Sequence, residues 1–243
     1  MGIATVVTSG KGGVGKSTIS VGVGRALAER GRRVLLVDCD AGLRSLDRMV
    51  GIDEALVFDT YDVVYARCAP IEAIYPCASS DNLFLLPAPS NAEDTINPQV
   101  MKRLVSLLKE YYDHVILDCP AGVGSGFKIA VCSADRALVV CNPDPVCVRG
   151  LSIVNRMLSE YKVENEGLVI NRFNGEFFSR IDSFDDLDAV IDAAETRLLG
   201  VVPEDFSCAA SFLKGKKADP KDKGMMALTR IAGRLEGETI PLP

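Results

Sequence analysis

The sequence contains no tryptophan and a single histidine, His114, among its 243 residues. This histidine follows an aspartate at the start of an apolar run, where a surface or strand-edge position is expected. Since general acid–base catalysis most often uses histidine, its scarcity argues against that chemistry here. We therefore look for a function that depends on other groups.

The eight cysteines include no C-x-x-C pair. This absence argues against a zinc ribbon or an iron–sulfur scaffold. Cys39, Cys119 and Cys141 lie at or beside the ends of apolar runs, and we expect them to be reduced, small core residues.

No apolar run approaches the roughly 18 residues that suggest a membrane span. No signal peptide is recognised, because the opening residues resemble a short strand that leads into a glycine-rich loop. We therefore expect a cytoplasmic protein, with peripheral attachment to the inner face of the membrane left open. A length of 243 residues, 48% of them apolar, suits one α/β domain over residues 1–243.

What the sequence does contain is a phosphate-binding pattern near its start. Gly10, Gly15, Lys16 and Ser17 fit G-x-x-x-x-G-K-[ST], between an apolar β-branched run and a helical pattern. Glycines let successive backbone N–H groups point at phosphate oxygens, and the helix that follows directs its positive dipole end at the same anion. The lysine adds a full charge, and the serine hydroxyl can bind Mg²⁺. The pattern predicts a nucleotide site.

Three aspartates follow apolar runs further along the chain. Asp38 and Asp40 come at the end of residues 34–37, and Asp118 ends residues 114–118. Ligands in open α/β sheets bind beyond the carboxyl ends of the strands. An apolar strand that ends in aspartate, paired with the phosphate loop, predicts a carboxylate that holds Mg²⁺.

Short apolar runs alternate with helical patterns along the whole chain. This order predicts a mostly parallel β-sheet with helices on both faces, in a single α/β domain. The expected strands are residues 3–8, 33–37, 83–87, 114–118, 137–141, 167–172 and 198–202.

Lys11 is a second lysine within the loop, which the general pattern does not require. The sequence K-G-G-V-G-K-S-T resembles the deviant Walker A motif of the MinD/ParA family of dimerising P-loop ATPases. Residues 37–47 are similar to switch I of the MinD branch, which is concerned with septum site determination. Residues 118–122 resemble its switch II, and residues 142–149 resemble its N-P-x-x-x-x-x-R segment.

The resemblance implies a role for each site residue. Lys16 and the loop amides would bind phosphate, Asp40 would position the attacking water, and Lys11 would reach the nucleotide of a second subunit in an ATP-bound homodimer. The metal residues would be Ser17, Asp38 and Asp118, for Mg²⁺. The nucleotide residues, for ATP or ADP, would be Gly10, Lys11, Gly12, Gly13, Val14, Gly15, Lys16, Ser17, Thr18, Asn171, Arg172, Pro203, Glu204 and Asp205. Of these, Asn171 would contact the adenine ring, and residues 203–205 would border it.

Two features of the C-terminal part of the sequence affect the expected partners. Members of the MinD branch typically end in a basic amphipathic extension that lies in the membrane interface, and no such segment is recognised here. The segment Lys214–Lys223 carries five lysines, diluted by aspartates. In a chain with a net charge of −6 we interpret it as a solvated loop, with DNA contact as the alternative.

The main functional hypothesis is a slow ATPase that regulates the position of cell division and is activated by a protein partner. One alternative is a ParA-like ATPase that partitions DNA or plasmids. Another is a nucleotide-dependent binding scaffold with little turnover. Relatives that insert metal clusters are a weaker option, because the C-x-x-C pair is missing.

Overall fold

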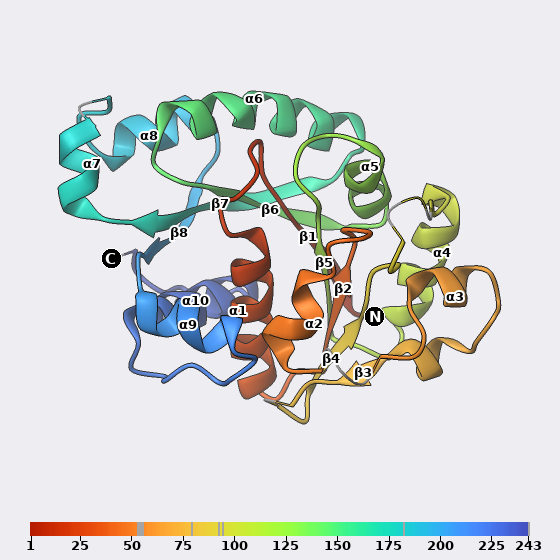
Figure 1. Cartoon of the computed structure of the whole chain (residues 1–243). Coiled ribbons are helices and arrows are strands. Elements are labelled where there is room, and N and C mark those ends of the chain that lie inside the picture. The colour runs from red at the N-terminus through yellow and green to blue at the C-terminus, as the bar shows by residue number, and fades with distance from the viewer. Residues whose placement is uncertain (53–55, 79, 92, 94, 182, 243) are drawn as a thin grey trace.

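A single β-sheet runs through the centre of the computed structural model, which describes all residues except 53–55, 79, 92, 94, 182 and 243 (Figure 1). In the described chain the sheet has eight strands in the order β3-β4-β2-β5-β1-β6-β7-β8. Neighbouring strands are parallel, apart from the short antiparallel pair β3–β4. The strands are β1 (Ile3–Thr8), β2 (Val34–Asp38), β3 (Tyr75–Pro76), β4 (Leu83–Leu86), β5 (His114–Asp118), β6 (Arg136–Cys141), β7 (Glu164–Phe173) and β8 (Leu198–Pro203).

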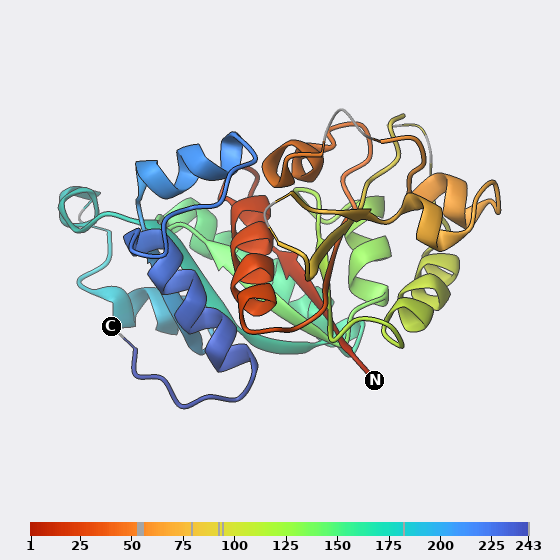
Figure 2. The same ribbon diagram turned by 90° about the horizontal axis from the view of Figure 1, so that it is seen from below.

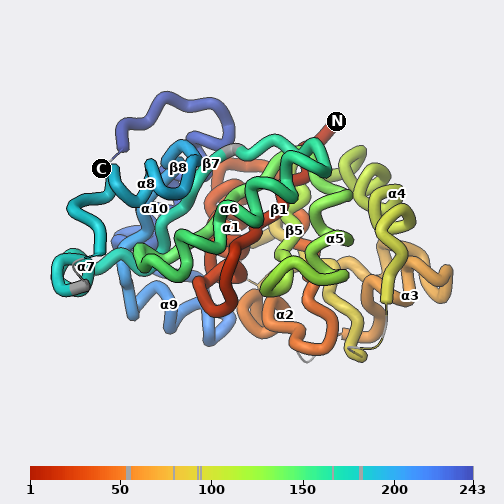
Figure 3. The backbone as a smooth tube through the Cα atoms, turned by 90° about the horizontal axis from the view of Figure 1, so that it is seen from above, coloured from red at the N-terminus to blue at the C-terminus, as the bar shows by residue number. Residues whose placement is uncertain are grey.

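Helices cover both faces of this sheet. One layer, seen from below in Figure 2, contains α1 (Lys16–Glu29), α2 (Ser45–Val50), α9 (Phe206–Leu213) and α10 (Lys223–Leu235). The other, seen from above in Figure 3, contains α4 (Pro98–Leu108), α5 (Ser125–Cys132), α6 (Pro145–Glu160) and α8 (Leu187–Ala194). The remaining helical segments are α3 (Thr60–Val64), the 3₁₀ turn η1 (Pro70–Ala73) and α7 (Gly175–Ile181). The predicted fold class is confirmed.

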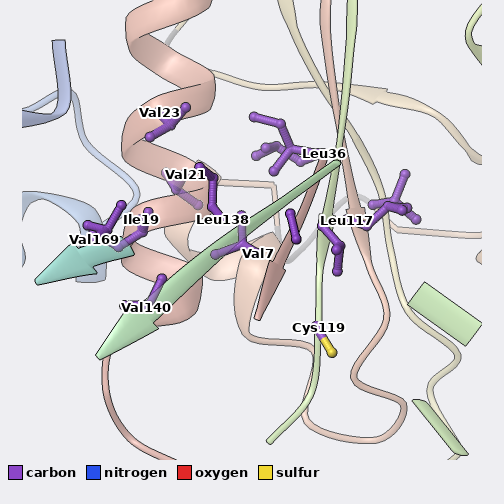
Figure 4. Packing of buried hydrophobic residues seen from close by; sticks show 14 of the residues in the cluster. Val7, Ile19, Val21, Val23, Leu36, Leu117, Cys119, Leu138, Val140 and Val169 are labelled. Carbon is purple, nitrogen blue, oxygen red and sulfur yellow. The ribbon is translucent and has the colours of Figure 1, made fainter. Parts of the chain in front are cut away.

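The hydrophobic core lies on both sides of the central strands. Figure 4 shows Ile19 of α1 beside Val169 of the sheet, and Val21 of α1 close to Leu138. All four are buried. The strand runs are apolar almost throughout because a parallel sheet covered on both faces offers its side chains no solvent. Two of the three cysteines expected in the core fit this picture, since Cys119 and Cys141 are buried free thiols, whereas the free thiol of Cys39 is only partly buried.

Some local predictions were incomplete or wrong. His114 is not a surface residue: it is 5% exposed, and its Nε2 lies 3.5 Å from the Glu236 carboxylate. The structure also contains the short helices α5, α7 and α9, whose seven or eight residues show no clear helical periodicity in the sequence. No helix of the described residues is both long and apolar enough to cross a bilayer.

The strand order places the phosphate loop beside the aspartates. β1 lies between β5 and β6, and β5 lies between β1 and β2. In this register Asp118 is opposite Val7 on one side and Asp38 on the other. The carboxyl ends of three strands that are far apart in sequence therefore meet at one edge of the sheet.

Candidate functional site

The loop between β1 and α1 curls at its glycines. Gly13 and Gly15 have φ angles of 76° and 94°, in the left-handed region that favours glycine. Helix α1 begins at Lys16, with Gly15 as its N-cap. The first N–H groups of a helix have no partner within it, so this loop offers donors and a positive dipole end to an anion.

Lys16 is the buried cation of the loop. It is 8% exposed, and its Nζ donates to Ser9 Oγ at 3.1 Å. The Ser9 hydroxyl in turn donates to the carbonyl of Lys11 at 2.7 Å. The ammonium group is thus held at the base of the loop, where a phosphate chain lying along the loop amides would meet it.

Asp118, at the end of β5, is held by two hydroxyl groups of α1. Ser17 Oγ donates to its Oδ2 and Ser20 Oγ to its Oδ1, each at 2.7 Å. Burial raises the pKa of Asp118 to about 6, although these two hydrogen bonds and the charge of Lys16 act to lower it.

Asp38 and Asp40 approach the same point from the end of β2. Asp38 accepts the backbone N–H of Asp40 at 2.9 Å and is 2% exposed. Burial, with the neighbouring Asp118 carboxylate as the second cause, raises the pKa of Asp38 to about 8. Burial also raises the pKa of Asp40, against the opposing charge of Lys16. Two buried carboxylates on adjacent strands repel each other unless a proton or a cation lies between them.

The donor atoms at this point fit Mg²⁺. The hydroxyl of Ser17 and the carboxylates of Asp38 and Asp118 are all oxygen ligands, which this hard cation prefers. The unfavourable proximity of the two buried carboxylates is an independent sign that the site suits a cation. Ser45 Oγ lies 3.5 Å from Ser17 Oγ and adds a further hydroxyl at the start of α2.

We expect Asp38→Asn to stabilise the nucleotide-free, metal-free protein at alkaline pH. The folded-state pKa of Asp38 is raised, so the folded chain holds a proton that the unfolded chain has lost between about pH 4 and 8. The free energy of unfolding of the wild-type protein should therefore fall as pH rises through this window, and the variant should lack that contribution. Thermal unfolding should give a melting temperature roughly 5 °C above wild type at pH 8. The difference should shrink by pH 5. If the melting temperatures of both proteins depended on pH in the same way, the raised pKa would not belong to Asp38.

The residues predicted to border the base surround a separate cavity of about 330 Å³. The lining includes Thr18, Asn171 and Arg172, together with the turn after β8. Asn171 is 4% exposed, and its Nδ2 donates to the carbonyl of Val14 at 2.7 Å. Its amide thus supports the phosphate loop as well as the cavity wall, while its contact with an adenine ring stays a prediction.

The turn after β8 is fixed by its own hydrogen bonds. Asp205 caps α9 through the N–H of Cys208 at 3.1 Å and also accepts the N–H of Gly224 at 2.9 Å, at the start of α10. Glu204 donates its N–H to the carbonyl of Phe173 at 2.9 Å. Pro203, Glu204 and Asp205 all line the cavity, so the structure brings the predicted base-side residues together.

Lys11 lies apart from this cluster. Its side chain is 45% exposed, and its Nζ lies 3.6 Å from Asp144 Oδ1. Asp144 is also the N-cap of α6, where it accepts the N–H of Cys147 at 2.9 Å. The lysine is therefore held at the mouth of the loop and directed toward α6 rather than toward the buried carboxylates.

Comparison with known proteins gives the family. Residues 5–218 match the family described as the CobQ/CobB/MinD/ParA nucleotide binding domain. The chain belongs to this family. It is 39% identical over its full length to the septum site-determining protein MinD of Bacillus subtilis, of which it covers 92%.

Solved structures of MinD/ParA family members agree with this assignment. The chain is similar to MinD in the MinC:MinD cell division protein complex of Aquifex aeolicus, with a TM-score of 0.89, 33% identity, and 99% and 98% of the two chains covered. It is also similar to Pyrococcus horikoshii MinD complexed with Mg-ADP, with a TM-score of 0.87, 29% identity, and 97% and 96% covered.

Sequence reasoning missed three polar residues of this MinD/ParA site. Ser9 supports Lys16, Ser20 binds Asp118, and Asp144 faces Lys11. Ser20 could have been found, because it lies three residues after Ser17 and therefore on the same helix face. Nothing local in the sequence connects Asp144 with Lys11, which lies 133 positions earlier in the chain.

Proposed function

We propose that residues 1–243 form one ATPase unit that binds ATP with Mg²⁺, forms a dimer in that state and takes part in placing the cell division site. The observation that carries this proposal is the combination of the Ser17, Asp38 and Asp118 cluster, in which both aspartates are buried, with an exposed Lys11 at the mouth of the same loop. The full-length likeness to MinD proteins supports the cellular role.

The geometry gives the chain's own residues distinct tasks. The loop amides and Lys16 bind the phosphates, and Ser17 with Asp38 and Asp118 would hold the metal ion. Mg²⁺ there would neutralise charge on the phosphates. Asp40, half-buried next to Lys16, orients the attacking water. Phosphoryl transfer needs mainly positioning and charge neutralisation, which these groups provide without covalent chemistry.

Dimer formation follows from the position of Lys11. The side chain is exposed and, within the described part of the chain, makes one surface ion pair, which contributes about 0–1 kcal/mol. Its ammonium group can therefore leave Asp144 at little cost and approach the phosphates of a second subunit. A partner protein of the division machinery is proposed from the MinC:MinD complex among the similar structures.

DNA partitioning remains the second candidate, and one observation bears on it. Lys217, within the Lys214–Lys223 segment, forms an ion pair with Glu29 at 2.8 Å. This surface pair competes only weakly with DNA for one lysine of the segment, and the chain as a whole is acidic. The net charge and the full-length likeness to MinD proteins therefore favour the division role over DNA binding.

Phosphate release, measured with the protein alone, with anionic phospholipid vesicles and with duplex DNA, tests these functions. We expect sedimentation to show a dimer with ATP and a monomer with ADP, and we expect slow phosphate release that DNA does not raise. Salt-sensitive, ATP-dependent DNA binding with raised turnover would support the partitioning alternative. A dimer without phosphate release under any of the three conditions would support the scaffold alternative.

A further inference from the structure

Both carboxylate oxygens of Asp118 are held by one helix. Ser17 and Ser20 each donate at 2.7 Å, the first to Oδ2 and the second to Oδ1. The two serines are three residues apart on α1, a spacing that places side chains on the same helix face. Asp118 is 2% exposed, so water does not replace either hydrogen bond readily.

Ser20 occupies a different environment from Ser17. Ser17 is partly exposed at the loop, whereas Ser20 has no accessible surface. Ser20 lies one turn deeper in α1, between buried Ile19 and Val21. Its hydroxyl can therefore influence a bound ligand only through Asp118.

The hydrogen bond from Ser20 determines how Asp118 is oriented. Because Oδ1 is fixed, the carboxylate cannot turn freely about its Cβ–Cγ bond, and Oδ2 remains directed at the Ser17 hydroxyl. If the Ser20 hydroxyl were removed, Oδ1 of Asp118 would be a buried acceptor that has lost its donor. Such a loss typically costs about 1–3 kcal/mol. The carboxylate would regain a partner only by rotating or by taking up a proton, and either change would disturb Oδ2.

We propose that Ser20 is a positioning residue for the divalent cation at this site. It preorganises Asp118 so that Oδ2 and the Ser17 hydroxyl form a fixed pair of oxygens. This inference rests on the nucleotide and Mg²⁺ site proposed above, and adds to it a residue that touches neither ligand. Groups that orient metal ligands typically change metal affinity about 10–100-fold when they are removed.

The experiment compares ADP affinity, measured by calorimetry, in EDTA and across a Mg²⁺ titration. For Ser20→Ala we expect the Mg²⁺ concentration that gives half of the metal-dependent gain in affinity to rise about 10-fold. ADP affinity in EDTA should stay within about twofold of wild type, because the loop amides and Lys16 are unchanged. Saturating Mg²⁺ should restore most of the wild-type affinity.

Ser133→Ala is a matched control. Ser133, at the C-terminal end of α5, is also a buried serine, 7% exposed, and its hydroxyl donates to the Ile129 carbonyl at 2.9 Å. It lies outside the site, so its removal should leave the Mg²⁺ titration unchanged.

Two results would overturn the inference. One is a Mg²⁺ dependence in Ser20→Ala equal to that of wild type. The other is an equal loss of ADP affinity with and without Mg²⁺, which would mean that Ser20 only supports the helix. A third outcome concerns the proposed function. If Mg²⁺ did not raise the ADP affinity of the wild-type protein, the proposed Mg²⁺ site itself would be wrong, and this result can be told apart from a difference between wild type and Ser20→Ala.

Discussion

Lys11→Ala is expected to lose ATP turnover by a factor of about 10³ while it still binds ATP and ADP. A cation supplied to the transferring phosphoryl group from another subunit accelerates the reaction by roughly 10³–10⁵. Among the residues that the structure describes, the Lys11 side chain makes one ion pair, with Asp144 at 3.6 Å, and it is 45% exposed. Removing it should therefore leave the fold and the local phosphate site intact.

Phosphate release at saturating ATP, together with calorimetric ADP affinity, checks this prediction. Lys214→Ala is a suitable control, because Lys214 is an exposed lysine outside the loop. Full ATPase activity in Lys11→Ala would exclude the mechanism in which the lysine acts across a dimer. A parallel loss of ADP affinity would instead place Lys11 at the nucleotide of its own subunit.

Gly15→Ala is expected to weaken ADP binding by at least about 100-fold, a loss of about 2.7 kcal/mol. A Cβ at this position would lie 2.3 Å from Asn171 Nδ2, and the φ angle of 94° is itself unfavourable for alanine. Asn171 is buried and bound to the Val14 carbonyl at 2.7 Å, so it cannot move aside without breaking that hydrogen bond. The collision therefore distorts both the loop and the wall of the base cavity.

Gly13→Ala separates this collision from backbone strain. Its φ angle of 76° is similarly unfavourable, but a Cβ there would meet no atom within 4 Å. We expect a loss of about 1–2 kcal/mol in stability from strain alone. Thermal unfolding compares the stability of the two variants, and calorimetry compares their ADP affinity. Equal ADP affinity in Gly15→Ala and wild type would show that the contact with Asn171 is not needed for the site.

Much of the candidate site followed from short spacings in the sequence. The glycines of the loop, Lys16 and Ser17 lie within eight positions, and their geometry in the structure agrees with the predicted phosphate site. Asp118 was predicted from its place at the end of an apolar run, and it lies next to Ser17 as expected. The shape of such a loop can be predicted locally because backbone curvature and helix dipoles depend on neighbouring residues.

Other features were beyond local reasoning. His114 is buried because Glu236, at the end of α10, packs beside it, and nothing near either residue in the sequence indicates that contact. The short helix α9 buries Cys208 and Phe212, and such tertiary contacts decide whether it forms, since isolated helices of this length are marginal in water. The likeness to MinD proteins supports the fold and a cellular role. The roles of the individual site residues remain predictions, which the variants described above would test.

The sequence by itself determined the α/β class and the phosphate loop, because strand and helix periodicity and glycine positions are set by neighbouring residues. The tertiary structure decided which distant groups complete the site. Ser20 and Asp118 are 98 residues apart, and Asn171 and Val14 are 157 residues apart. Their contacts depend on β1 lying between β5 and β6 in the sheet. Strand order results from the packing of the whole chain, so no local pattern could have specified these partners.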